Sequence, residues 1–203
     1  MQIIPKADVV PSLTELCICT IAQQIERKEL LHFFDYLFDL GLMETAGQLC
    51  CQIIRMETSM FLQHAEFNDL NPRVLSWLLN QPSLNIRSEF DLFDACVQWA
   101  KTACGKAGLE ASSTNVRTTL GQLVFLLRIP AMSRDDLVKA IKAGIFDQQE
   151  EQILLQHNTQ DKVDKATMDT ASRDFLSQFV NGFLRRNRPC TIVLDIPFCP
   201  YMN

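Results

Sequence analysis

Cysteine and histidine are the residue types in this 203-residue chain whose side chains could do chemistry. A thiolate beside an imidazole base is a nucleophile, and cysteines and histidines at suitable spacing bind zinc. The cysteines that fall in apparent helices are Cys17, Cys19, Cys50, Cys51, Cys96 and Cys104, and the histidines are His32, His64 and His157. Zinc binding and thiol catalysis are therefore the two chemistries to weigh.

The spacing of the paired cysteines does not suit a metal site. Structural zinc sites pair their ligands two to four residues apart, as in Cys-x-x-Cys. Cys17 and Cys19, and Cys50 and Cys51, are closer than this, and on a helix they point about 200° and 100° apart. We expect neither a metal nor another cofactor.

Thiol catalysis is the less favoured interpretation. A free cysteine on an apolar helical face usually acts as a small hydrophobic residue, and no electropositive neighbour in the sequence would lower a thiol pKa. The glycines are dispersed and form no phosphate-binding loop. The N-terminus has no apolar signal core, so we expect reduced thiols and a cytoplasmic protein. The sequence predicts that the protein is not an enzyme.

Charge and hydropathy exclude two further classes of partner. A formal net charge of −5 disfavours nucleic acid, which needs a concentrated basic surface. The one basic cluster, Arg185-Arg186-Asn187-Arg188, fits a helix C-terminus. Uncharged apolar stretches are shorter than the roughly 20 residues of a membrane span, so we expect no membrane contact.

The elements that carry these side chains are helices. Ser88 begins the clearest of them, with Asp91 in position to close a capping box. The positions that follow at three- and four-residue steps form one wide apolar face: Leu92, Phe93, Cys96, Val97, Trp99, Ala100 and Ala103. Such a stripe predicts a buried helix without reactive groups.

Further start signals are spread along the chain. They are Ser12 with Glu15, Asn71 with Pro72, Ser133 with Asp136, and Asp147 with Glu150. An apolar stripe at Phe175, Leu176, Phe179, Val180 and Phe183 predicts one more helix over residues 170–186. We predict an all-α, antiparallel bundle of about eight to ten helices, with a partly disordered C-terminal tail.

Two runs resemble the BACK domain, the helical module that follows BTB in adaptors of cullin-dependent ubiquitin ligases. The first matches at Ser88, Glu89, Leu92, Phe93, Ala95 and Trp99, and the second reads Leu127-Arg128-Ile129-Pro130-Ala131-Met132. Upstream, Cys50, Ile54 and Phe67 fit the same pattern. The branch with BTB, BACK and a C-terminal PHR sandwich is the most similar.

The resemblance implies a division of the chain into three parts. Residues 1–26 resemble the last helix of BTB, residues 27–157 the BACK domain, and residues 158–203 hold a linker, one amphipathic helix and the tail. Most of BTB and all of PHR are then missing. We expect a non-catalytic interaction scaffold, similar to the BACK part of a substrate adaptor for a cullin-three RING ligase. The alternative is a BACK-only module or competitor that acts without a cullin.

The same resemblance directs attention to two helical faces as candidate partner sites. Leu13, Leu16 and Ile21 lie on the stripe that BTB would cover. Phe33, Tyr36 and Leu37 lie where related adaptors have a three-box that helps to bind the cullin-three N-terminal domain. For Phe33 and Tyr36 a place in the core is an equal alternative, and for Leu37 it is the favoured one.

Six residues are expected to have structural roles, namely Ser88, Glu89, Phe93, Trp99, Arg128 and Pro130. Arg128 lies between two apolar residues, so its guanidinium must be close to the core. A charge in that position persists mainly when it is paired. We expect hydrogen bonds from Arg128 to helix-terminal carbonyls or to a carboxylate, with Glu89 as the candidate.

Overall fold

The computed structural model describes residues 13–42, 47–156 and 175–179. The elements, in chain order, are α1 (Leu13–Gln24), α2 (Arg27–Asp39), α3 (Gly47–Met56), α4 (Thr58–Phe61), the 3-10 helix η1 (Ala65–Asp69), α5 (Pro72–Leu79), α6 (Glu89–Lys106), α7 (Ser113–Leu120), the 3-10 helices η2 (Gly121–Leu126) and η3 (Ile129–Ala131), α8 (Arg134–Ile141) and α9 (Gln148–Gln156). No strand occurs in these residues. The all-α prediction is confirmed.

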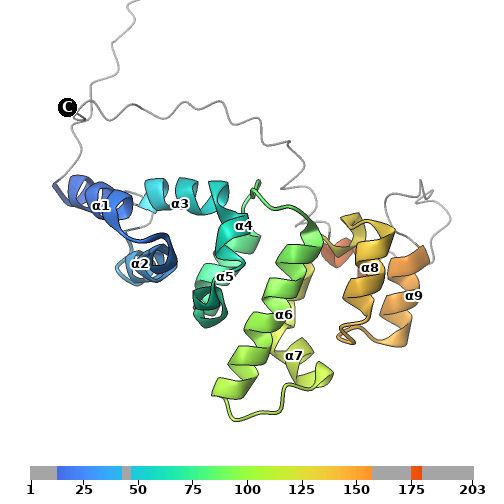
Figure 1. The fold of residues 1–203 in the computed structure, drawn as a ribbon. Helices are drawn as coiled ribbons and strands as arrows, with labels where there is room; N and C mark the ends of the chain where they lie inside the picture. Colours follow the sequence, from blue (N-terminus) through green and yellow to red (C-terminus); the bar gives the residue numbers. More distant parts are fainter. Residues whose placement is uncertain (1–12, 43–46, 157–174, 180–203) are drawn as a thin grey trace, which may run out of the picture.

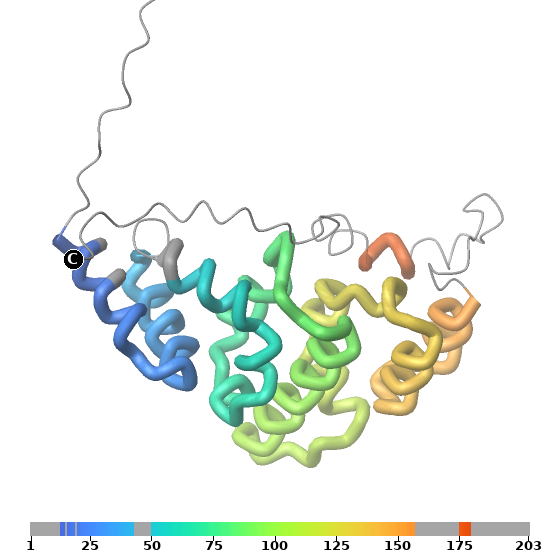
Figure 2. Tube along the Cα trace, turned by 45° about the horizontal axis from the view of Figure 1, so that its top comes forward, coloured from blue at the N-terminus to red at the C-terminus, as the bar shows by residue number. Residues whose placement is uncertain are grey.

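The helices follow one another across an elongated bundle, with α1 at one end and α9 at the other (Figures 1 and 2). The longest helix, α6, lies in the middle and packs on η1, α7, α8 and η3. At the N-terminal end α3 packs on both α1 and α2. None of the helices described is long and apolar enough to cross a membrane.

Side-chain caps begin the helices where the sequence predicts them. Asn71 accepts a hydrogen bond from the backbone N–H of Arg73 at 3.0 Å, with Pro72 in the first position of α5. Ser133 caps α8 in the same way. Asp147 and Glu150 form a reciprocal capping box at α9, with bonds of 2.8 and 3.1 Å. The predicted box at Ser12 lies outside the described residues.

Apolar residues at three- and four-residue steps from Val116 to Leu127 would fit one continuous helix, but Gly121 divides it. α7 ends at Leu120, and the chain continues as η2 because Gly121 has a φ of +48°, which an L-residue rarely adopts. The apolar positions of both segments still face the core, so periodicity alone gave no sign of the break.

Residues 175–179 are helical and pack on the bundle. The ring of Phe179 is 5.2 Å from that of Phe125 in η2 and 5.4 Å from that of Phe175. Phe179 is buried, so this part of the stripe docks on the bundle. Val180, Phe183, the basic run and the expected disordered tail lie outside the described residues.

Candidate interaction surfaces

The helix α1 presents apolar side chains on its outer face. Leu13 is 77% exposed and Ile21 44%, and Leu16 is exposed with them. The opposite face holds Ile18 and Ala22, which are buried where α1 packs on α3. Among the described residues, the stripe that the sequence assigns to a partner is thus exposed, and Ile18 and Ala22 attach α1 to the bundle.

The helix α2 has a deeply buried face and a partly apolar outer end. Leu37 is 1% exposed and belongs to the core, so it is removed from the candidate partner residues. Phe33 is half-buried against the core. Tyr36 is 60% exposed, and Leu40, which sequence reasoning did not select, is exposed beside it at the C-cap. Tyr36 and Leu40 therefore form the exposed apolar part of this helix.

The start of α6 is joined to η3 by an ion pair. Ser88 Oγ accepts the backbone N–H of Asp91, and the Arg128 guanidinium is 3.1 Å from the Glu89 carboxylate. Both charged side chains are largely buried, at 17% and 14% exposure. The Asp91 carboxylate does not complete a capping box, because it binds Arg87 instead at 3.1 Å.

The middle of α6 forms the centre of the core. Trp99 is buried, and its indole N–H donates to the carbonyl of Leu70 at 2.8 Å. Phe93 stacks on Phe146 with ring centroids 6.3 Å apart. Pro130 is buried in η3. These side chains hold η1, η3 and the segment before α9 against α6.

Most of the cysteine side chains that the structure describes are buried or partly buried. Cys50, Cys96 and Cys104 are buried, and Cys17 is exposed. Burial raises the pKa of the Cys51 thiol from 9.0 to about 11, with the neighbouring Cys50 as a second cause. Such a shift makes the thiolate rarer at neutral pH. No group of three or more potential metal ligands occurs among the residues that the structure describes.

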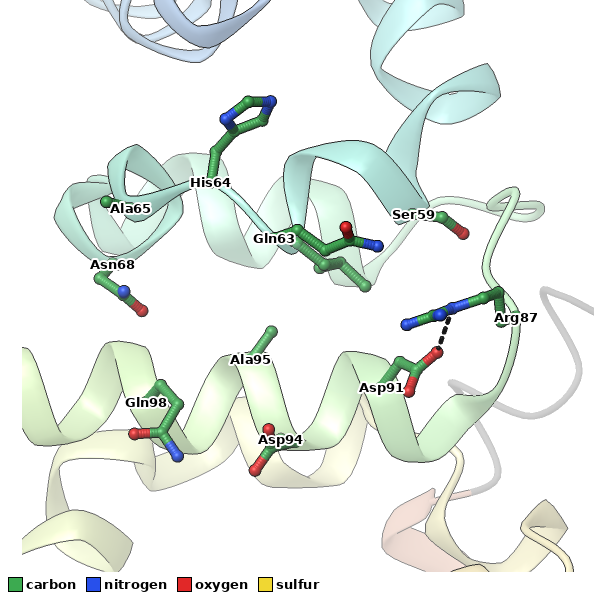
Figure 3. A pocket seen from close by; sticks show the side chains of 11 residues that line it. Ser59, Gln63, His64, Ala65, Asn68, Arg87, Asp91, Asp94, Ala95 and Gln98 are labelled. Carbon is green, nitrogen blue, oxygen red and sulfur yellow. Dashed lines mark hydrogen bonds and ion pairs between the residues drawn. The ribbon is translucent and has the colours of Figure 1, made fainter.

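A polar groove runs between α6 and the α4–η1 segment (Figure 3). Its volume is about 310 Å³. In Figure 3 Ala95 points from α6 into the groove, Asn68 points toward α6 from the opposite wall, and the Arg87–Asp91 pair closes one end. His64 points away from the groove.

A larger cleft lies on another part of the molecule. It has a volume of about 870 Å³ and is bounded by α2, the start of α5, the end of α6 and the junction of α7 with η2. Asp35 of α2 lies at its edge. Burial, with the nearby Asp39 as a second cause, raises the pKa of the Asp35 carboxyl. Asp35 was not among the candidates from sequence, because the cleft beside it is formed by segments that are far apart in the chain.

The chain is similar to a known domain family and to several known proteins. The family model described as "BTB And C-terminal Kelch" (BACK) matches residues 40–142. "BTB/POZ domain-containing protein 3" of Homo sapiens is 28% identical over 144 residues, which are 70% of this chain and 27% of that protein. "BTB/POZ domain-containing protein 6-B" of Danio rerio is 27% identical over 133 residues, covering 64% and 27%. The chain thus spans about a quarter of the length of these relatives. No solved structure matches.

Proposed function

The chain belongs to the BACK domain family, and from this premise we propose that it is a non-catalytic, cytoplasmic interaction scaffold of a cullin-three RING ubiquitin ligase adaptor. The family is one of adaptors rather than enzymes. The observation that carries the proposal is the exposed apolar face of α1, at Leu13, Leu16 and Ile21. Apolar surface of this kind marks a protein-binding site.

Two helices have separate tasks in this proposal. The outer face of α1, at Leu13, Leu16 and Ile21, contacts a BTB domain. The exposed end of α2, at Tyr36 with the half-buried Phe33, contacts the N-terminal domain of cullin-three. Tyrosine suits this task, because it combines a large apolar area with a hydroxyl and is common among residues that dominate binding energy.

The proposed domain division follows the same scheme. Residues 1–26 act as the BTB-contacting segment, residues 27–157 as the BACK bundle and residues 158–203 as a C-terminal extension. The packing of α1 on α3 supports a fixed position for α1, the described part of the first segment, relative to the bundle.

Replacing Ile21 with serine is expected to lower the free energy of unfolding by less than about 1 kcal/mol, because a side chain that is 44% exposed loses few buried contacts. Replacing Ile18, which is 6% exposed on the same helix, is the matched control. Ile18→Ser removes a buried side chain and introduces a hydroxyl, so it should cost about 2–3 kcal/mol. Urea unfolding followed by circular dichroism measures both. Equal losses for the two variants would show that Ile21 is a core residue and would remove the basis of the proposal.

A further inference from the structure

The cleft beside α2 has the size and lining of a binding site. Its volume of about 870 Å³ falls in the range of about 300–1,000 Å³ that is typical of ligand sites. The lining is mainly apolar, and its principal members are Leu70, Pro72, Trp99, Ala103, Leu120 and Leu123. Ala103 and Ala107, one turn apart on α6, have short side chains, so an incoming chain can approach the helix closely.

The charges at the cleft do not balance. Lys106 and Asp69 line it as an ion pair at 2.8 Å, so this cation is already neutralised. Asp35 makes no ion pair in the segments that the structure describes. The nearest arginine on α5, Arg73, is 3.9 Å from the Asp39 carboxylate instead. One negative charge is therefore left at the edge of an apolar cleft.

Asp35 is partly buried, and no ion pair among the described residues includes it. Burial is the main cause that raises the pKa of its carboxyl, and Asp39 adds to it; His32 and Arg73 act in the opposite direction and are too weak to reverse it. A carboxylate in this state is stabilised by any cation that approaches it. Apolar walls beside the carboxylate exclude water and strengthen that attraction.

We infer that the cleft docks a peptide segment of a partner protein in which an arginine follows an apolar residue. The guanidinium binds the Asp35 carboxylate, and the apolar side chain lies over Pro72 and Leu123, which are more accessible than the buried floor of the cleft. Arginine fits because its planar fork matches a carboxylate with two parallel hydrogen bonds. The inference rests on the proposed function only in taking the chain as a protein-binding module; α1 and Tyr36 do not line this cleft.

The experiment is a nuclear magnetic resonance titration of the full chain with the dipeptide N-acetyl-Leu-Arg-amide. The reporter is the indole N–H of Trp99, which lines the cleft and donates to Leu70. The indole of Trp77 is the internal control, since it packs on Phe34 with ring centroids 4.5 Å apart, away from the cleft. The dipeptide should shift the Trp99 signal saturably and leave the Trp77 signal unchanged. N-acetyl-Leu-Gln-amide, which is neutral, should bind about fivefold more weakly.

Two variants of α2 separate the proposed contact from a general effect of charge. Asp35→Asn should reduce the affinity for the arginine dipeptide about fivefold, to the level of the glutamine dipeptide. Asp39→Asn, one turn away and outside the cleft, should leave it unchanged. Asp35→Asn removes an uncompensated charge, so the fold should tolerate it, and an unchanged thermal melt verifies this.

Equal binding of both dipeptides, equal effects of both variants or an unshifted Trp99 signal would overturn the inference. These results do not depend on the unfolding comparison of Ile21 with Ile18. The proposed function and the proposed docking cleft can therefore fail independently of each other.

Discussion

Replacing Trp99 with alanine is expected to lower the free energy of unfolding by about 3–5 kcal/mol. The side chain is 4% exposed and lies where α6 meets η1, so its removal leaves a cavity in the middle of the bundle. The carbonyl of Leu70 also loses its hydrogen bond from the indole. For a chain of this length the loss corresponds to a fall of roughly 6–20 °C in Tm. Thermal unfolding followed by circular dichroism measures it.

Trp99→Phe separates the two contributions of this side chain. Phenylalanine keeps much of the apolar volume and removes the N–H donor, so the expected loss is about 1–3 kcal/mol. If Trp99→Ala melted within about 1 °C of the original protein, Trp99 would not be part of the core and the description of α6 would be wrong.

Replacing Arg128 with methionine is expected to lower the free energy of unfolding by about 3 kcal/mol. Methionine retains much of the apolar length of arginine, so the main effect is the loss of the guanidinium. Glu89 then keeps a largely buried charge without the ion pair observed at 3.1 Å. Its hydration is not restored, and this makes the loss large. Chemical unfolding of the variant at neutral pH gives the value.

The pair Arg87–Asp91 provides a matched control, because it also lies at the start of α6 and has the same 3.1 Å separation. Arg87 is 70% exposed, so Arg87→Met should cost less than about 1 kcal/mol. The double variant Arg128→Met with Glu89→Met should recover part of the loss, since both buried charges are then gone. Equal losses for Arg128→Met and Arg87→Met would mean that burial of the first pair has no energetic consequence.

Sequence reasoning was most successful where local signals and burial agree. The stripe of α6 from Leu92 to Trp99 is buried, and the caps at Asn71 and Ser133 begin their helices. Periodicity and capping are local properties, and tertiary packing here follows them. Gly121 is the exception. Its positive φ ends α7, and a single glycine in the sequence does not predict whether the chain will adopt such a φ.

The surfaces were harder to predict than the elements. Amphipathicity alone could not separate the buried Leu37 from the exposed Tyr36 beside it on α2. The cleft at Asp35 was not predicted at all, because its walls come from four separate segments of the chain. A site of that kind becomes visible only when the packing of those segments is known.

The link to a cullin ligase is tested most directly by calorimetric titration of the full chain with the N-terminal domain of cullin-three. The account predicts a Kd of about 10 μM or tighter, which corresponds to roughly −7 kcal/mol. Tyr36→Ala should weaken binding about tenfold, while Val138→Ala, at an exposed position on α8, should leave it unchanged. Absence of binding would contradict the account and leave the chain as a BACK module that acts without a cullin.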